Sequence, residues 1–105
     1  MTDLEMTRLC AEAMGWKTKV VSGVPYDTVY RLKEQSPKGE WNEWNPLHDD
    51  AQAMALVKKC KLTIQREHHG DRWAVGNPHP EAMNLDLNRA IVECVAKMQK
   101  AKTPQ

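Results

Sequence analysis

The segment Trp44–Ala51 (WNPLHDDA) constrains the fold of this 105-residue chain more than any other stretch. Its proline favours a turn, and the paired carboxylates Asp49 and Asp50 stand directly before an apolar-periodic run, which is the pattern of a helix N-terminus. Asp49 as N-cap and Gln52 as its capping-box partner predict a helix that begins near position 49. The segment therefore predicts a turn that follows a tryptophan and leads directly into a helix. By itself it indicates no reaction.

Three stretches have the periodicity of amphipathic helices. The first spans about residues 2–14, with Thr2 and Glu5 as a capping box and Gly15 as the stop. The second begins near Asp49 and ends near Cys60. The last spans about residues 85–100 and has the strongest stripe of the chain. Its apolar positions are Leu87, Ala90, Ile91, Cys94, Val95 and Met98.

Four short stretches have the alternation or the β-branched and aromatic content of strands. Trp16–Val21 and Tyr26–Leu32 form one expected pair, followed by a polar loop over 34–40. The other pair is a hairpin, in which Leu62 and Ile64 precede a turn and Trp73 and Val75 follow it. The residues after Val75, through Pro80, are expected to form a loop. We therefore predict an α+β domain in which three helices cover a small antiparallel sheet of about four strands.

Composition limits the class of protein. At 12.0 kDa the chain is the size of one domain, which we assign to residues 1–102, with residues 103–105 as a frayed tail. A formal net charge of +1 weakens a nucleic-acid role, which depends on clustered cationic side chains. No apolar run reaches the length of a membrane span, and the N-terminus does not resemble a secretory signal. We therefore expect a cytoplasmic protein with neither nucleic acid nor membrane as its partner.

The three cysteines are expected to be structural. Cys10, Cys60 and Cys94 are far apart, and each lies in a helical apolar pattern or at its end. Such positions favour buried, reduced thiols over disulfides or metal ligands. A cysteine nucleophile would require an exposed thiolate beside a base.

The cluster His48-Asp49-Asp50 is the first candidate site. A His beside an Asp resembles the metal dyad of HD-type phosphohydrolases, but such a site needs further ligands that the spacing of this chain does not supply. Adjacent helical residues also diverge by about 100°, so the two carboxylates would not converge on one ion. The structural interpretation is that one carboxylate caps the helix and the other interacts with the helix dipole or with a cation such as Arg89.

The second candidate site is a corner formed by Trp41 and Trp44, with Asn42, Glu43 and Asn45 beside them. Exposed indoles would offer a stacking platform for a nucleotide or for a partner's side chain. We expect Trp44 to pack against the helix that follows it, with Pro46 fixing its approach, and Trp41 to be the surface anchor.

The remaining histidines lie in expected turns and loops. His68 and His69 fall in the hairpin turn and His79 in a Pro-rich loop, where histidines are usually solvated, although a His-rich rim can bind a transition metal. The sequence contains no phosphate-binding Gly-rich loop, no Gly-x-Ser-x-Gly elbow and no His-Glu-x-x-His motif.

Several segments resemble a known family, the small phage and prophage proteins described as the phage ABA-sandwich domain. The similarity covers roughly the whole chain, and the block Trp44–Asp50 is its most specific part. The departures are the loop with Pro78-His79-Pro80 and the long polar connection before Trp41, where one member could carry its own binding surface. The resemblance implies a phage origin and an α/β/α layered sandwich, and no agreed activity. Its segments are Met14–Trp16, Trp44–Asp50 with Ala53 and Leu56, and Asn88–Val92.

We expect a non-enzymatic phage or prophage accessory protein, without cofactor or metal, that binds a host protein or a small ligand, for example to counteract a host defence system. The alternative is a small metal-dependent phosphoesterase that uses the His48-Asp49-Asp50 cluster, and a nucleic-acid binder is a weaker third reading. A homodimer stays open, since three apolar stripes and one small sheet need not all be buried within one chain. The expected binding residues are Trp41, Trp44, Asn45, His48, Asp49, Asp50 and Arg89.

Overall fold

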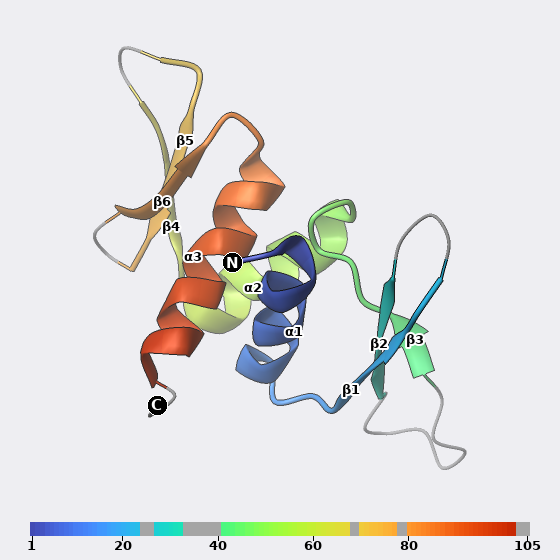
Figure 1. Ribbon diagram of the computed structural model, residues 1–105. Coiled ribbons are helices and arrows are strands. Elements are labelled where there is room, and N and C mark those ends of the chain that lie inside the picture. The colour runs from blue at the N-terminus through green and yellow to red at the C-terminus, as the bar shows by residue number, and fades with distance from the viewer. Residues whose placement is uncertain (24–26, 33–40, 68–69, 78–79, 103–105) are drawn as a thin grey trace.

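The structure is a computed structural model of the chain, and it describes residues 1–23, 27–32, 41–67, 70–77 and 80–102. Three helices and six short strands follow one another along these residues (Figure 1). In chain order they are α1 (Asp3–Ala13), β1 (Thr18–Val21), β2 (Thr28–Leu32), β3 (Trp41–Glu43), α2 (Asp50–Cys60), β4 (Thr63–Arg66), β5 (Trp73–Gly76), β6 (Pro80–Asn84) and α3 (Leu87–Lys102).

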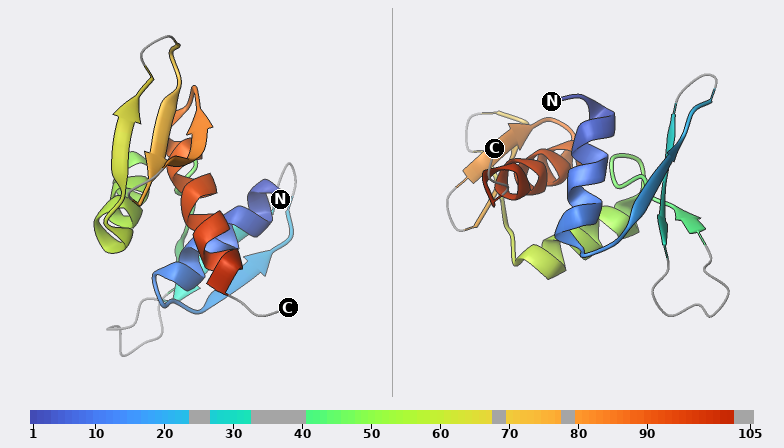
Figure 2. Two further views of the ribbon diagram at one scale, coloured as in Figure 1. Left: turned by 90° about the vertical axis from the view of Figure 1, so that its left-hand side faces the viewer. Right: turned by 60° about the horizontal axis from the view of Figure 1, so that its bottom comes forward.

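The helices form the middle of the molecule. α3 packs against α1 and α2, and it also contacts β5 and β6, while α1 contacts β2. Two views show one sheet beyond α3 and the other beyond α1, so that the helices lie between the sheets (Figures 1 and 2). α3 is central because its apolar stripe is wide enough to meet both helical neighbours and a sheet. Its buried side chains are Ala90, Ile91, Val92, Cys94, Val95 and Ala96.

The first sheet is antiparallel with strand order β1-β2-β3. Its central row pairs Lys19 with Tyr30 and Tyr30 with Glu43. Because side chains alternate along a strand, Val20 and Val29 point to the opposite face. Val29 is buried and Val20 packs on the core, so this opposite face is the inner one.

The second sheet is antiparallel with strand order β4-β5-β6. The predicted hairpin is confirmed, with Ile64 opposite Val75. β5 is the central strand, and Ala74 and Val75 on it are buried. The pairing of β5 with β6 shifts register between Val75 and Gly76, which re-aims the strand end where the expected loop begins.

The sequence predicted the α+β class and the three helices, and the structure confirms both. Thr2 caps α1 by accepting a hydrogen bond from the Glu5 amide, and Gly15 adopts the left-handed conformation that ends it. The single four-stranded sheet is wrong, because the described strands form two sheets of three. The α/β/α order is not the arrangement seen here, since the helices lie between the sheets.

Two strands were missed for physical reasons. β3 has only three residues, too few to show alternation. β6 begins with Pro80 and contains Glu81 and Asn84, residues that are depleted in strands. Proline is tolerated as the first residue of an edge strand, where its missing amide breaks no ladder bond. The loop expected through Pro80 therefore ends earlier than predicted, and residues 78–79 lie outside the described part.

The first sheet and the helices are joined by Trp44, whose side chain is 1% exposed. Its indole Nε1 donates a hydrogen bond to the backbone oxygen of Thr7 on α1 at 3.0 Å, and its ring meets Trp16 edge to face with centroids 5.0 Å apart. Its backbone amide donates to the oxygen of Val29 at 2.8 Å. We expected Trp44 to pack against α2, the helix that follows it. Its indole hydrogen bond is instead to α1, the helix that precedes it in the sequence. Trp44 thus ties α1, β2 and the segment before α2 together.

In the part of the chain that the structure describes, none of the helices combines the length and the apolarity that crossing a membrane requires.

Replacing Trp44 by alanine should lower the free energy of unfolding by about 3–5 kcal/mol, because it leaves a large cavity and removes a buried hydrogen bond. Trp44→Phe, which keeps an aromatic ring but loses the donor, should cost less than Trp44→Ala. Chemical denaturation followed by circular dichroism measures both. Leu85→Ala is the control: Leu85 is 69% exposed, so its loss should change stability by less than about 0.5 kcal/mol. Equal effects at positions 44 and 85 would contradict the assigned role of Trp44.

Candidate functional site

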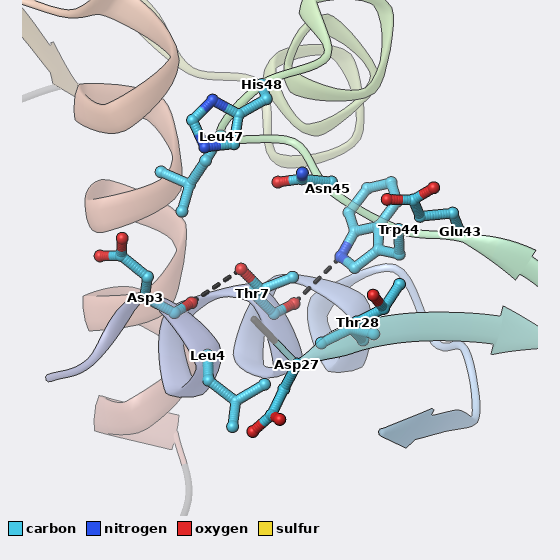
Figure 3. A pocket seen from close by; sticks show the side chains of 11 residues that line it. Asp3, Leu4, Thr7, Asp27, Thr28, Glu43, Trp44, Asn45, Leu47 and His48 are labelled. Carbon is cyan, nitrogen blue, oxygen red and sulfur yellow. Dashed lines mark hydrogen bonds between the residues drawn. The ribbon is translucent and has the colours of Figure 1, made fainter. Parts of the chain in front are cut away.

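Three of the predicted binding residues, Trp44, Asn45 and His48, line one cavity of about 470 Å³. It lies between the first half of α1, the start of β2 and the connection from β3 to α2 (Figure 3). This volume falls in the range of small-molecule pockets. The other lining residues are Asp3, Leu4, Thr7, Asp27, Thr28, Val29, Glu43 and Leu47.

The lining combines an apolar surface with negative charge. Leu4, Val29 and Leu47 supply apolar area beside the indole, whereas Asp3, Asp27 and Glu43 are carboxylates. No lysine or arginine is among the lining residues. Asp27 and Glu43 are exposed, so they stay hydrated and accessible to a ligand. Such a lining favours a ligand that joins an apolar body to a positive charge.

The carboxylate of Asp3 is already paired with Arg89, whose Nη2 lies 2.8 Å from Asp3 Oδ1. Arg89 also reaches Glu93 one turn along α3, at 3.3 Å. The hydrogen bond that Arg89 donates to the Asp3 carboxylate raises the pKa of Arg89, which keeps the guanidinium charged. Arg89 therefore holds the N-terminus of α1 against α3 and is not among the residues that line the cavity. Among the described residues, the other two lining carboxylates, Asp27 and Glu43, form no salt bridge.

The turn that carries Asn45 and His48 is held by Gln52. The Gln52 side-chain oxygen accepts a hydrogen bond from the Asn45 amide at 2.6 Å, and its Nε2 donates to the Glu43 backbone oxygen at 3.0 Å. The Gln52 amide in turn donates to Asp49 Oδ1 at 3.0 Å, so Asp49 is the N-cap of α2 as predicted. The capping pattern pointed to Gln52, but its side chain bonds the end of β3 and the turn after it. Gln52 thereby fixes one wall of the cavity.

A second hollow of about 280 Å³ lies on the other side of the same turn. It shares Glu43, Asn45 and His48 with the first cavity and adds Asp49 and Gln52. The second hollow therefore adds the carboxylate of Asp49 to that of Glu43 beside the turn after β3.

Of the two interactions expected for Asp50, the position in the first turn of α2, where the helix dipole acts, is seen, but Arg89 is not its partner. Asp50 Oδ1 accepts a hydrogen bond from Asn88 Nδ2 at 2.7 Å, which links α2 to α3, while the expected partner Arg89 pairs with Asp3. The prediction named the correct segment of α3 but the wrong residue in it. Positions 88 and 89 differ by about 100° around the helix, so Asn88 faces Asp50 and Arg89 faces Asp3.

His48, Asp49 and Asp50 do not converge. All three are exposed, Asp49 caps α2, and Asp50 bonds across to α3. Within the described part of the chain, no group of three or more His, Cys, Asp or Glu side chains is placed to hold a metal ion. His68, His69 and His79 lie outside the described residues.

The predicted corner of two tryptophans is split by the sheet. Trp44 is buried in the core, whereas Trp41 is 37% exposed. Lys19 places its ammonium 4.6 Å from the centroid of the Trp41 ring, a cation–π contact. Trp41 is therefore a surface residue, as expected, but it does not share a site with Trp44.

The predicted burial of the thiols is confirmed for two of the three cysteines. Cys10 and Cys94 are buried, and Cys60 is half-buried at the end of α2. Burial raises the pKa of Cys94 to about 11 and raises the pKa of Cys10 and Cys60 as well. The Cys10 thiol donates to the Val92 backbone oxygen at 3.5 Å. Thiols that resist deprotonation are poor nucleophiles at neutral pH.

Comparisons of the chain with protein-family models, with curated proteins and with solved structures find no match.

Asp49→Ala should lower the free energy of unfolding by about 1 kcal/mol, because it removes the N-cap of α2, and Asp49→Ser should largely preserve stability. Thermal or chemical denaturation of the two variants measures the difference. Equal loss with serine and alanine would contradict the capping role.

A thiol reagent applied to the native protein at pH 8 should label Cys60 first, since that side chain is half-buried. Cys10 and Cys94 should react at the slower rate of local or global opening, because they are buried and their pKa values are raised. Mass spectrometry of peptides over a time course gives the three rates. Rapid labelling of Cys10 would contradict the packing of α1 against α3.

Proposed function

We propose that this chain is a non-enzymatic binding protein whose ligand site is the cavity between α1, β2 and the turn after β3. The observation that carries the proposal is the convergence of Trp44, Asn45 and His48 with residues of α1 and β2 on one open hollow of about 470 Å³. These segments are far apart in the sequence, and the indole of Trp44 and the side chain of Gln52 hold them together. A preformed, partly apolar hollow with a few polar groups is the usual form of a recognition site.

The lining supports a positively charged ligand. Asp27 and Glu43 are exposed carboxylates without a lysine or arginine beside them in the lining, and Leu4 and Leu47 provide apolar contact. An amine or guanidinium group on an apolar stem fits this chemistry, either as a small molecule or as a basic side chain on a protein. The negative lining also weighs against a nucleic-acid backbone as the ligand.

We further propose a phage or prophage accessory protein, working in the cytoplasm of the host cell and acting on a host protein or small ligand. Its support is the resemblance of the Trp44–Asp50 block and the Asn88–Val92 segment to the phage ABA-sandwich family. Both segments connect elements of the fold. The first lines the cavity, and the second contributes Asn88 and Arg89, which bond α3 to the other two helices. Counteraction of a host defence system is the concrete role that this origin suggests.

A metal-dependent phosphoesterase at His48-Asp49-Asp50 has less support. The two carboxylates already serve as an N-cap and as an interhelical hydrogen-bond acceptor. A site for phosphoester hydrolysis would need these groups to turn toward a common ion.

Asp27→Lys should abolish or weaken ligand capture by about tenfold or more, because it places a cation where the proposed ligand carries its own. The tagged chain is used as bait in a bacterial host lysate, and bound proteins and small molecules are identified by mass spectrometry. The captured species is then titrated against each variant by calorimetry.

The matched control is Glu12→Lys, the same change of charge at an exposed position of α1 that does not line the cavity. Capture by wild type and Glu12→Lys, with loss in Asp27→Lys, supports the cavity as the site. Equal capture by all three, with the circular dichroism unchanged, would place the ligand elsewhere, and no capture by wild type would count against a binding function.

A further inference from the structure

The first turns of α2 and α3 border a further hollow, of about 350 Å³, which is separate from the cavity. Asp50 on α2 accepts a hydrogen bond from Asn88 Nδ2 on α3 at 2.7 Å, so these two turns lie side by side. Met54, Leu87 and Ile91 are the apolar side chains of its lining. Ile91 is 1% exposed and lies at the bottom, whereas Met54 is 42% exposed at the rim. The hollow, called the helix-start hollow below, therefore leaves apolar area open to water.

The charged groups that line the helix-start hollow are two carboxylates, Asp50 and Asp86. Their hydrogen-bond donors are neutral, since Asp50 accepts from the Asn88 side-chain amide and Asp86 accepts from backbone amides at the start of α3. Among the described residues neither carboxylate forms a salt bridge. The helix N-termini contribute only about half an elementary positive charge each, which two carboxylates outweigh. An apolar hollow with a negative rim is the result.

The helix-start hollow continues a row that begins at the cavity. The hollow of about 280 Å³ shares Glu43 and His48 with the cavity and is also lined by Asp49. The next residue of the chain, Asp50, lines the helix-start hollow. No lysine or arginine lines any of the three. An elongated ligand that follows this row around the N-terminus of α2 meets negative charge along its whole length.

A row of separate hollows favours a polypeptide over a small cation. A single amine fills one hollow and leaves the others to water. A polyamine carries cations along its length but has no apolar branch to cover Met54 and Leu87. A protein segment presents one side chain after another, and peptide-binding surfaces take such side chains in separate pockets. The carboxylates along the row select lysine or arginine in that segment and repel an acidic one.

We propose that the ligand of this chain is a basic protein segment, with a lysine or arginine in the cavity and a large apolar side chain in the helix-start hollow. The inference rests on the proposed function, because the basic side chain occupies the site assigned there. It adds the class of the partner and a second subsite. In that subsite the apolar side chain contacts Met54 and Leu87 and covers Ile91, while basic neighbours in the segment lie near Asp50 and Asp86.

Selection from random sequences tests the class of the partner. A library of short random peptides displayed on phage is selected against the immobilised full-length chain. The enriched peptides should combine lysine or arginine with a large apolar residue. One of them is synthesised and titrated by calorimetry, beside pentylamine and spermidine as small cations. The peptide should bind about tenfold more tightly than either small cation, because it fills more than one hollow.

Substitutions in the helix-start hollow test the second subsite. Met54→Ser removes apolar area there and should weaken the peptide by about fivefold or more, with pentylamine unchanged. The double variant Asp50→Asn with Asp86→Asn removes two charges, while the amide oxygens still accept the hydrogen bonds within the fold. It should also weaken the peptide and make its binding less dependent on salt. Asp27→Lys in the cavity should weaken both the peptide and pentylamine.

The matched controls change the same side chains at positions that line none of the three hollows. Met83→Ser alters a methionine on β6 that is 47% exposed, and Glu12→Gln removes an exposed charge from α1. Both should bind the peptide as the wild type does. Circular dichroism of every variant shows whether the fold is kept.

Enriched basic peptides that are weakened by Met54→Ser and by Asp27→Lys, and by neither control, would establish the proposal. Spermidine that binds as tightly as the best peptide would overturn it. So would a peptide that is insensitive both to Met54→Ser and to the asparagine pair, or a selection that enriches no basic peptide. In these cases pentylamine that is lost in Asp27→Lys leaves the cavity as the site of a small cation. Binding that is equal in wild type and Asp27→Lys, or no binding of any probe, counts against the cavity as well.

Discussion

The hydrogen bond from the Trp44 indole to the Thr7 backbone oxygen is the contact on which the arrangement of the first sheet depends. It is buried, so breaking it would leave a donor without water or partner, and that cost makes the alternative positions of the segment unfavourable. The same residue closes on β2 through its amide and on Trp16 through its ring. Its neighbours in sequence, from Asn45 to His48, are therefore delivered to one place beside α1, and the cavity follows from that placement.

Polar side chains then fix the details of this region. Gln52 bonds the turn and the end of β3, Asn88 bonds Asp50, and Arg89 bonds Asp3. Most of these contacts are exposed, and each contributes modestly to stability. Their importance is geometric, because each joins two elements that the apolar core alone would allow to slide. The acidic lining is what remains after these ties are made, since Asp27 and Glu43 are not used by a neighbouring cation of the lining. Some carboxylates of this region, such as Asp3 and Asp50, hold the helices together, whereas Asp27 and Glu43 face the cavity.

Prediction from sequence succeeded where a property is local. The stripes of α1, α2 and α3 repeat over three or more turns, so their helices and caps were readable, including Asp49 as the N-cap. It failed where a short segment depends on a neighbour. β3 and β6 become strands because β2 and β5 present free edges to them. Arg89 and Asn88 are one residue apart, and only the rotation of α3 against α1 and α2 decides which of them reaches Asp50.

For the candidate site the sequence alone identified the turn from Trp44 to Asp50 and the two tryptophans, because an indole, a proline and a capping carboxylate have strong local preferences. It also determined the class of the fold and the buried state of two of the three thiols, since both follow from the periodicity of apolar residues. Only the tertiary structure decided that Trp41 and Trp44 lie on opposite sides of a sheet and that Asp27, which directly precedes β2, shares a cavity with His48. It likewise decided that the strands divide into two sheets with the helices between them. Contacts between segments far apart in the chain depend on how whole elements pack, and no local pattern records that packing.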